Sequence, residues 1–350
     1  MVSPGANENR MSVIETSEVA CDLCGSDEAT FLFEGVDRLH GIGGRFTYVR
    51  CKACGLVYMN PQVVPESIGL LYPESYAPHA DKSKTSRSVF MALREGLRKI
   101  PLLGTELRRF TDARVMAPLM RRLNADARLL DVGCGSGAFL DAVRGDTGCH
   151  VQGVDVSHLA VETARRLYGV DVFEGPVTEA PFSDATFDAI TAWWYLEHVA
   201  KPNEAVAAMS RLLKDGGTCV IGIPNFDSVF ARRFKDKWYH LDCPRHMCIW
   251  TPKTIRRLLS QHGLSVTRIY YDRSPWGLLG SLQYRVYGDN ANPKHRNRIR
   301  QSALLWLLFL PLTIVVSLLR RSDIIVVYAK KTGRVAEREI SEDRKGGQRS

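Results

Sequence analysis

The stretch RLLDVGCGSG, residues 128–137, decides the fold of this chain. Apolar residues lead into Asp131, and three glycines then alternate with other residues until a helical pattern begins at Ala138. This order predicts a strand, a glycine-rich turn and the N-terminus of a helix. Glycine lacks a Cβ and tolerates positive φ, so such a turn lets the backbone come close to a ligand. The glycines are Gly133, Gly135 and Gly137.

A second apolar run, HVQGVDV at residues 150–156, places Asp155 near the end of the next expected strand. An acid at the tip of the second strand of a βαβ unit can hold the two hydroxyls of a ribose. The turn before it reads Asp-x-Gly-x-Gly-x-Gly, which differs from the Gly-x-Gly-x-x-Gly pattern of dinucleotide-binding proteins. We therefore expect a ribose-containing ligand. A tight strand-to-helix turn without any ligand is the alternative.

The rest of the chain alternates between expected strands and helices, which predicts a sheet covered by helices on both faces. The fold class is therefore α/β, a Rossmann-like sheet of seven strands. Ligands of such sheets bind at the carboxyl ends of the strands, where Asp131, Asp155 and Trp193 fall. The further strands are expected at residues 170–174, 187–193, 218–223, 264–271 and 324–330, and further helices at 158–169, 203–213 and 252–263.

Two CxxC knuckles, CDLCG and CKACG, account for four of the nine cysteines. Their pattern predicts a tetrahedral four-thiolate zinc site, which is structural because no ligand position stays open. A redox pair or an incidental pair is the alternative, but a reducing compartment disfavours disulfides. The expected ligands are Cys21, Cys24, Cys51 and Cys54. The other cysteines, Cys134, Cys149, Cys219, Cys243 and Cys248, are expected to be packing residues.

Residues 20–275 resemble the class I S-adenosylmethionine (SAM)-dependent methyltransferases, here with an N-terminal zinc-ribbon-like module. The resemblance rests on the glycine turn and on CGLVYMNP, APFSDATFDAI, YLEHV, LLKDGG and GIPN, which occur in that order. It implies a seven-stranded methyltransferase sheet in which the turn holds the methionine part of SAM. It also implies that Asp155 binds the ribose and that Trp193 lines the methyl-donor pocket.

The resemblance departs from the family beside the expected adenine site. The family often has an acid after the glycine that follows the third strand, but in this chain Pro176 follows Gly175. A backbone contact from Val177 is therefore implied instead. The implied SAM-binding residues are Asp131, Gly133, Cys134, Gly135, Gly137, Asp155, Val156, Val177 and Trp193.

Two segments carry candidates for the proton transfer that accompanies methyl transfer. The segment with Glu197 and His198 resembles that of the ubiquinone-type O-methyltransferases, where Glu-x-x-Glu-His can hold a divalent metal. Here Trp194 stands at the first glutamate position, so the ligand set is incomplete. Weak metal binding, acid–base catalysis and a purely structural role all remain open. The segment KWYHLDCPRHMCIW is expected to overhang the strand ends, with His246 as the preferred general base and His240 as the second. The alternative is a loop that only closes the pocket.

Residues 303–319, ALLWLLFLPLTIVVSLL, contain no charged side chain. The segment has the minimum length for a membrane-spanning helix, Pro311 interrupts it, and basic residues flank both ends. We expect a kinked hairpin or an in-plane helix that enters one leaflet, because the strand that follows must return to the sheet. A helix buried in the core or in a dimer interface is the alternative. A basic amphipathic stretch at residues 88–122 is expected on the same membrane face or as a linker helix.

Composition agrees with a globular chain of about two domains. The 350 residues are 45% apolar, and the net charge of +9 favours anionic surfaces. The N-terminus lacks the apolar region of a signal peptide, so we expect a cytoplasmic protein attached to the inner face of the cell membrane. The expected parts are a disordered tail (1–18), the zinc module (19–78), a basic helical linker (79–122), the SAM-binding core (123–273), an insertion (274–322), the last strand (323–331) and a disordered tail (332–350).

Three functions are compatible with these features. The first is methyl transfer to a small-molecule, glycan or lipid-linked acceptor at the membrane, in cell-envelope or polysaccharide biosynthesis. The second is RNA methylation through the zinc module and the basic surface, which the lack of an interleaved basic and aromatic patch disfavours. The third is a non-catalytic scaffold, against which the intact glycine turn and Asp155 argue.

Overall fold

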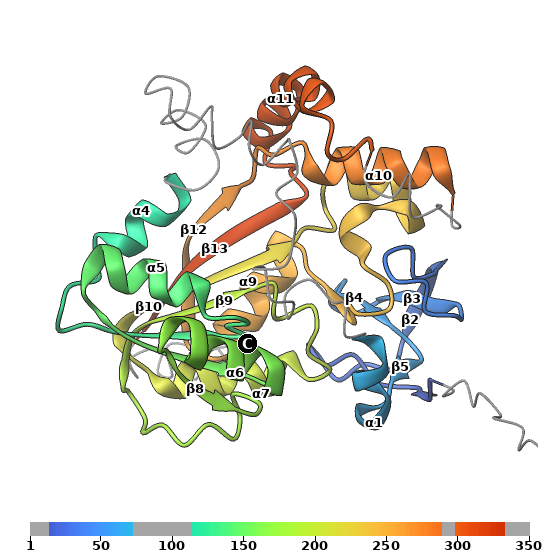
Figure 1. Cartoon of the computed structure of the whole chain (residues 1–350). Coiled ribbons are helices and arrows are strands. Elements are labelled where there is room, and N and C mark those ends of the chain that lie inside the picture. The colour runs from blue at the N-terminus through green and yellow to red at the C-terminus, as the bar shows by residue number, and fades with distance from the viewer. Residues whose placement is uncertain (1–13, 73–113, 289–297, 333–350) are drawn as a thin grey trace, which may run out of the picture.

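The computed structural model describes residues 14–72, 114–288 and 298–332 (Figure 1). Its centre is a seven-stranded sheet in the order β12-β13-β10-β9-β6-β7-β8. β13 lies antiparallel between β10 and β12, and the pairs from β10 to β8 are parallel. The expected seven-stranded α/β fold is thereby confirmed. The strands are β6 (Arg128–Val132), β7 (His150–Asp155), β8 (Asp171–Glu174), β9 (Phe187–Trp193), β10 (Leu213–Pro224), β12 (Leu264–Tyr271) and β13 (Ile324–Lys331).

Helices cover both faces of this sheet. Neighbouring residues of a strand point to opposite faces, so the apolar strands present buried side chains on both sides. Leu129 and Val220 belong to the core under one group of helices, and the next residues, Leu130 and Ile221, belong to the core under the other group. The first group is α4 (Arg114–Met120), α5 (Ala138–Thr147) and α6 (His158–Tyr168), and the second is α7 (Pro202–Leu212) and α9 (Pro252–Gln261).

Side-chain caps mark the starts of α6 and α9. The Ser157 side chain accepts a hydrogen bond from the Ala160 amide at the start of α6. Thr251 and Thr254 form a reciprocal capping box at the start of α9. β10 differs from expectation because it begins at Leu213, which pairs with β9 directly after α7, and a register shift then precedes the regular pairing.

A smaller antiparallel sheet holds the N-terminal region, in the order β11-β4-β3-β2. Its fourth strand, β11, comes from the loop after β10 of the large sheet, where Cys248 and Ile249 pair with β4. A segment of the expected core therefore completes the N-terminal sheet. The strands are β2 (Ala29–Gly35), β3 (Phe46–Cys51), β4 (Val57–Met59) and β11 (Cys248–Ile249). The pair β1 (Thr16–Ser17) and β5 (Gln62–Val63) precedes α1 (Pro65–Ile68) and the 3-10 turn η1 (Gly69–Leu71).

The N-terminal region and the large sheet also share one hydrophobic core, which includes Leu23, Leu56 and the inner side chains of α7 and α9. Side-chain hydrogen bonds join the same surfaces, such as the 3.2 Å bond from Gln261 to the Leu23 carbonyl. The two regions are therefore packed as one body. The expected boundary at residue 78 and most of the basic linker lie outside the described residues, as do most of both expected tails.

The loop after β10 contains α8 (Val229–Phe234) and the 3-10 turns η4 (Lys235–Lys237) and η5 (Tyr239–Leu241), and α10 (Trp276–Tyr287) and α11 (Ala303–Leu318) form the expected insertion. α11 runs through Pro311 as one helix, so the expected kinked hairpin is wrong. The Thr313 and Ser317 hydroxyls donate to backbone carbonyls of the segment after β12 and of β12 itself, which fixes one side of the helix. Within the described ranges, no helix has the length and apolar character needed to cross a membrane.

Candidate functional site

The glycine turn between β6 and α5 has a backbone that favours glycine. Gly133, Gly135 and Gly137 have φ angles of 73°, 52° and 76°, all in the left-handed region. A Cβ on Gly133 would lie 2.8 Å from the Tyr195 ring, and one on Gly137 would lie 2.9 Å from the Cβ of Ala164. The residues behind the turn therefore leave no room for side chains at these two positions.

Asp155 connects this turn to the end of β7. One carboxylate oxygen accepts the Gly135 N–H at 2.8 Å, and the other accepts the Ser157 N–H at 2.9 Å. Each carboxylate oxygen can accept more than one hydrogen bond. Asp155 can therefore still accept hydrogen bonds from two hydroxyls of a ligand while its amide contacts hold it in place.

Asp131 lies inside the sheet at the start of the turn. The Thr191 hydroxyl donates to its carboxyl at 2.6 Å. Burial raises the pKa of Asp131 to about 7, although the Thr191 hydrogen bond acts in the opposite direction. Cys134 is also buried and packs on β7, where a Cβ on Gly153 would lie 2.5 Å from its sulfur. These two side chains support the turn from within the fold.

The remaining predicted donor-site residues lie around the same strand ends. Val156 follows Asp155 and is 71% exposed, so it offers apolar surface beside the acid. Val177 is buried two residues after Gly175, whose N–H donates to the Asp155 carbonyl at 3.0 Å. Trp193 ends β9 and packs edge-on against Phe139 of α5, with ring centroids 5.6 Å apart. The carboxyl ends of β6, β7, β8 and β9 thus carry the predicted set.

Glu197, His198 and His246 form a second cluster beyond the end of β9. Their ligand-type atoms lie within 4.8 Å of one another, although they come from two separate loops. Glu197 is fully buried, and among the described residues neither carboxyl oxygen has a hydrogen-bond partner. Burial raises the pKa of Glu197 to about 8. This carboxyl is therefore protonated at neutral pH unless a cation or another ligand group stabilises its anion.

His246 presents a neutral ring to this cluster. Its Nδ1 lies 2.9 Å from the His240 carbonyl, and its Nε2 lies 4.0 Å from Glu197 Oε1. The carbonyl can only accept a hydrogen bond, so Nδ1 carries the proton and Nε2 carries a lone pair. Burial lowers the pKa of His246 to about 3, and the neighbouring His198 acts in the same direction.

His240 lies in an aromatic environment of its own. Its ring stacks on Trp194 at a centroid distance of 5.7 Å and meets the rings of Trp238 and Tyr239 edge-on. Trp194 has a φ of 55°, a strained value for a residue with a side chain. Burial lowers the pKa of His240 to about 4. The two histidines predicted as bases thus have different neighbours.

The N-terminal region holds the loop that carries both histidines. Arg245, fully buried, donates to both carboxylate oxygens of Asp37 at 3.0 and 2.8 Å and also pairs with Asp242 at 2.7 Å. The Tyr48 hydroxyl donates to the His246 carbonyl at 2.9 Å, next to the pairing of β11 with β4. The position of His246 therefore depends on the N-terminal sheet.

One residue beside the second cluster, Tyr72, was not predicted. The Tyr72 hydroxyl lies 3.0 Å from His198 Nδ1, across 126 positions of sequence. No local pattern connects these two residues. Asp242, which the segment KWYHLDCPRHMCIW places close to His246, has its Oδ2 3.9 Å from His246 Nε2.

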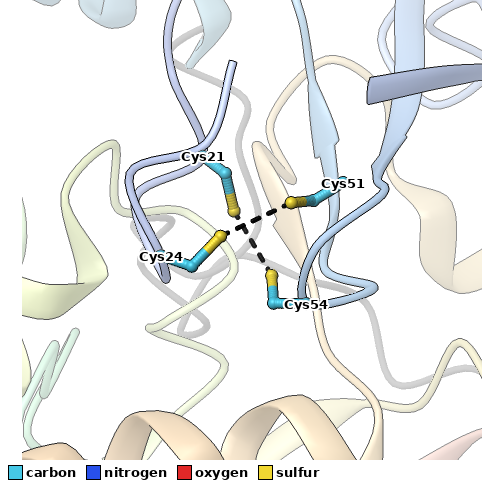
Figure 2. A group of neighbouring side chains, drawn as sticks. All are labelled: Cys21, Cys24, Cys51 and Cys54. Atoms are coloured by element: carbon cyan, nitrogen blue, oxygen red, sulfur yellow. Dashed lines mark hydrogen bonds between the residues drawn. The ribbon is translucent and has the colours of Figure 1, made fainter. Parts of the chain in front are cut away.

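The four knuckle cysteines point at one centre (Figure 2). The Sγ atoms of Cys21 and Cys54 are 3.5 Å apart, as are those of Cys24 and Cys51, far beyond a disulfide bond. Four sulfurs about 2.3 Å from a zinc ion in a tetrahedron would be about 3.8 Å apart. Both knuckles turn through a glycine with positive φ. The arrangement fits a four-thiolate zinc ion, and the other five cysteines are buried, as expected of packing residues.

Residues 105–269 match the model of a family described as a methyltransferase domain. The ubiquinone biosynthesis O-methyltransferase of Thiobacillus denitrificans is 40% identical over 115 residues, which cover 31% of this chain and 46% of that protein. The demethylmenaquinone methyltransferase of Clavibacter sepedonicus is 35% identical over 120 residues, covering 33% of this chain and 46% of that protein. The chain thus spans less than half of the length of these relatives. Among solved structures, geranyl diphosphate C-methyltransferase from Streptomyces coelicolor aligns with a TM-score of 0.46 at 16% identity, over 75% of this chain and 89% of that one.

Proposed function

We propose that this chain transfers a methyl group from SAM to a small-molecule acceptor. The observation that carries the proposal is the contact of Asp155 with the glycine turn at the carboxyl ends of β6 and β7. The match of residues 105–269 to a methyltransferase domain supports it. The names of the curated relatives favour a small molecule as acceptor.

SAM, when bound, supplies a methyl group on a sulfonium that an acceptor atom attacks in line. The chain's own task is to position both partners and to take up a proton. In our proposal the glycine turn binds the methionine part, Asp155 binds the ribose hydroxyls, and Val156 and Val177 flank the adenine. Trp193 then separates the donor site from the acceptor side.

The acceptor side of the proposed site is formed by the segment after β9 and the loop after β10. Trp194 and His240 provide a flat stacked surface there. Glu197, His198 and His246 provide nitrogen and oxygen atoms that can take part in moving a proton from the acceptor. The low pKa values of His240 and His246 make both rings weak bases while they stay buried. His198 is less buried than the other two histidines and contacts the Tyr72 hydroxyl.

Calorimetry with SAM tests the donor site. Asp155→Ala should weaken SAM binding by about 1.5–3 kcal/mol, or roughly 10- to 150-fold, because charged hydrogen bonds are lost. Asp171→Ala, which removes an exposed acid at the start of the neighbouring β8, is the matched control and should bind SAM as the wild type does. Folded wild-type protein that binds no SAM would contradict the proposal.

The acceptor class is tested by incubating the protein and methyl-labelled SAM with fractions of a cell extract. We expect label in small molecules or in lipid-extractable material. Label in RNA would instead support RNA methylation as the function. Binding of SAM without any methyl transfer would support a non-catalytic scaffold.

We extend the proposal to a membrane surface because one side of α11 is exposed and apolar. Leu304, Leu308 and Leu318 are 77%, 66% and 67% exposed, an unusual density of apolar surface for one helix. Arg298 and Arg320, both exposed, lie at its two ends and complement anionic lipids. Arg300 does not serve this purpose, because it packs over the rings of Tyr239 and Trp276. In our proposal α11 lies in the plane of the inner membrane face, a position that favours a lipid-linked acceptor.

Sedimentation with vesicles of anionic and of neutral lipid tests this attachment. Leu308→Glu should reduce binding to anionic vesicles by about 10- to 100-fold, the cost of losing one buried leucine side chain. Leu70→Glu, at an exposed leucine of the N-terminal region, is the matched control and should bind normally. Wild-type protein that stays in the supernatant with both kinds of vesicle would rule the attachment out.

A further inference from the structure

The cluster of Glu197, His198 and His246 is assembled from two loops that the sequence does not connect. Glu197 and His198 follow β9, and His246 lies 48 positions away from His198, beyond β10. The candidate ligand atoms of the three residues lie within 4.8 Å of one another. His246 thus adds a third candidate donor to the adjacent pair Glu197 and His198.

The ring of His246 is oriented as a metal ligand. His246 Nδ1 is held by the His240 carbonyl at 2.9 Å, which leaves the Nε2 lone pair facing Glu197 Oε1 at 4.0 Å. That separation is too long for a hydrogen bond. Two ligands each about 2.1 Å from one ion lie about 3.0–4.2 Å apart, depending on the angle between them. A backbone carbonyl that fixes the far nitrogen of a histidine is the usual support of a metal ligand.

Glu197 is buried next to this histidine without a hydrogen-bond partner among the described residues. Its side chain is 0% exposed, and among the described residues neither of its carboxyl oxygens has a hydrogen-bond partner. A buried carboxyl without partners is costly, and a bound cation removes that cost. Asp242 also faces this space, but its carboxylate already pairs with Arg245 at 2.7 Å, so we do not count it as a ligand.

We infer that Glu197, His198 and His246 bind one divalent transition-metal ion, separate from the four-cysteine site. Two imidazoles and one carboxylate suit zinc, iron or cobalt, whereas magnesium and calcium prefer oxygen ligands throughout. Three protein ligands leave coordination positions open. An ion here could bind an oxygen of the acceptor and lower the pKa of an acceptor hydroxyl; that role rests on the proposed function, but the binding of the ion does not.

The test counts metal ions on the full chain, without SAM or acceptor. Wild-type protein is incubated with Zn²⁺, desalted and analysed for zinc per chain. We expect two zinc ions in the wild type and one in Glu197→Gln, whose amide is a poor zinc ligand. Calorimetric titration of Zn²⁺ into wild-type protein already loaded at the cysteines should show one further site. The zinc affinity of this site should fall at least 100-fold in Glu197→Gln, because losing a direct ligand costs more than losing a supporting residue.

Matched variants make the count decisive. His198→Asn, at the less buried ligand, should also hold one zinc ion and serves if Glu197→Gln does not fold. His150→Asn, at an exposed histidine that starts β7, should keep two. Cys51→Ser/Cys54→Ser should lose the other ion, and Co²⁺ in that double variant should lack the thiolate charge-transfer band. Wild-type protein with a single zinc ion, or Glu197→Gln with two, would overturn the inference. A failure to bind SAM would leave the metal count unchanged and would count against the proposed function alone.

Discussion

Asp37→Asn should uncouple the N-terminal sheet from the loop that carries His246. Asp37 is buried and accepts both terminal nitrogens of the fully buried Arg245, together with the backbone amide of Leu39 at 2.8 Å. The asparagine keeps one oxygen acceptor but removes the charge. Arg245 then retains only the carboxylate of Asp242 as its anionic partner among the residues described.

The magnitude follows from the burial of this pair. Removing one partner of a buried ion pair costs about 3–5 kcal/mol, because the other charge stays buried without compensation. We expect the lower end, about 3 kcal/mol, since Asp242 continues to pair with Arg245. Glu34→Gln is the matched control: its pair with Arg45 at 3.4 Å is exposed, so the cost should be below about 1 kcal/mol.

The pH dependence of this difference has a defined sign. Burial alone would raise the pKa of Asp37, but hydrogen bonding to Arg245 and the charge of Arg245 outweigh burial and lower this pKa below its ordinary value. A depressed pKa contributes stability above the unfolded-state pKa, and that stability is lost as pH falls through the folded-state pKa. The difference in the free energy of unfolding between the wild type and Asp37→Asn should therefore be largest at pH 7 and should shrink below about pH 4.

Urea unfolding of zinc-loaded protein at several pH values, with SAM calorimetry on the same samples, checks this reasoning. We expect Asp37→Asn to lose stability and methyl transfer while keeping SAM affinity within about threefold, because its contacts lie on the acceptor side. The reasoning is refuted if Asp37→Asn and Glu34→Gln lose equal stability, or if the loss for Asp37→Asn does not change with pH.

Three further changes have expected outcomes. Gly133→Ala should weaken SAM binding at least tenfold in calorimetry, since its φ of 73° and the tyrosine ring 2.8 Å from its Cβ disfavour a side chain. Gly145→Ala, in an open position of α5, should bind normally. Burial raises the pKa of Asp323 to about 7. The contribution of the protonated carboxyl to the free energy of unfolding is therefore full below about pH 4 and is lost as pH rises through 7, by about 4 kcal/mol at most. In urea unfolding, Asp323→Asn should lose less stability over this pH range than the wild type, and an equal loss in both proteins would contradict the assignment. Cys54→Ser should lose zinc and show faster hydrogen exchange in β11, because β11 pairs with β4 of the N-terminal sheet. Cys149→Ser, at a buried cysteine outside the knuckles, should keep both zinc and slow exchange. Unchanged exchange in both variants would show that zinc does not support β11.

The features that could be predicted from the sequence are those set by residues close together in the chain. The glycine turn, its acid Asp155 and the two knuckles each follow from a spacing of a few residues, because the backbone of one turn determines where those groups lie. The same applies to Ser157 and Thr251, whose caps mark the starts of α6 and α9.

The features that could not be predicted depend on contacts between distant residues. The pair of Arg245 and Asp37 spans 208 positions, and neither residue has a local pattern that points to the other. The pairing of β11 with β4 and the contact of Tyr72 with His198 are of the same kind. Sequence reasoning therefore found the residues of the second cluster, but it could not show that His246 joins Glu197 while His240 faces Trp194.

The place of β13 in the large sheet has a consequence for how this chain reaches its native state. β10 and β12 do not pair with each other, and both pair with β13, which is the last strand of the sheet in chain order. Until residues 324–331 are synthesised, both strands present open edges that can pair with other chains. A chain that ends before Ile324 should thus accumulate as aggregate even though every residue of the predicted donor and acceptor sites is present.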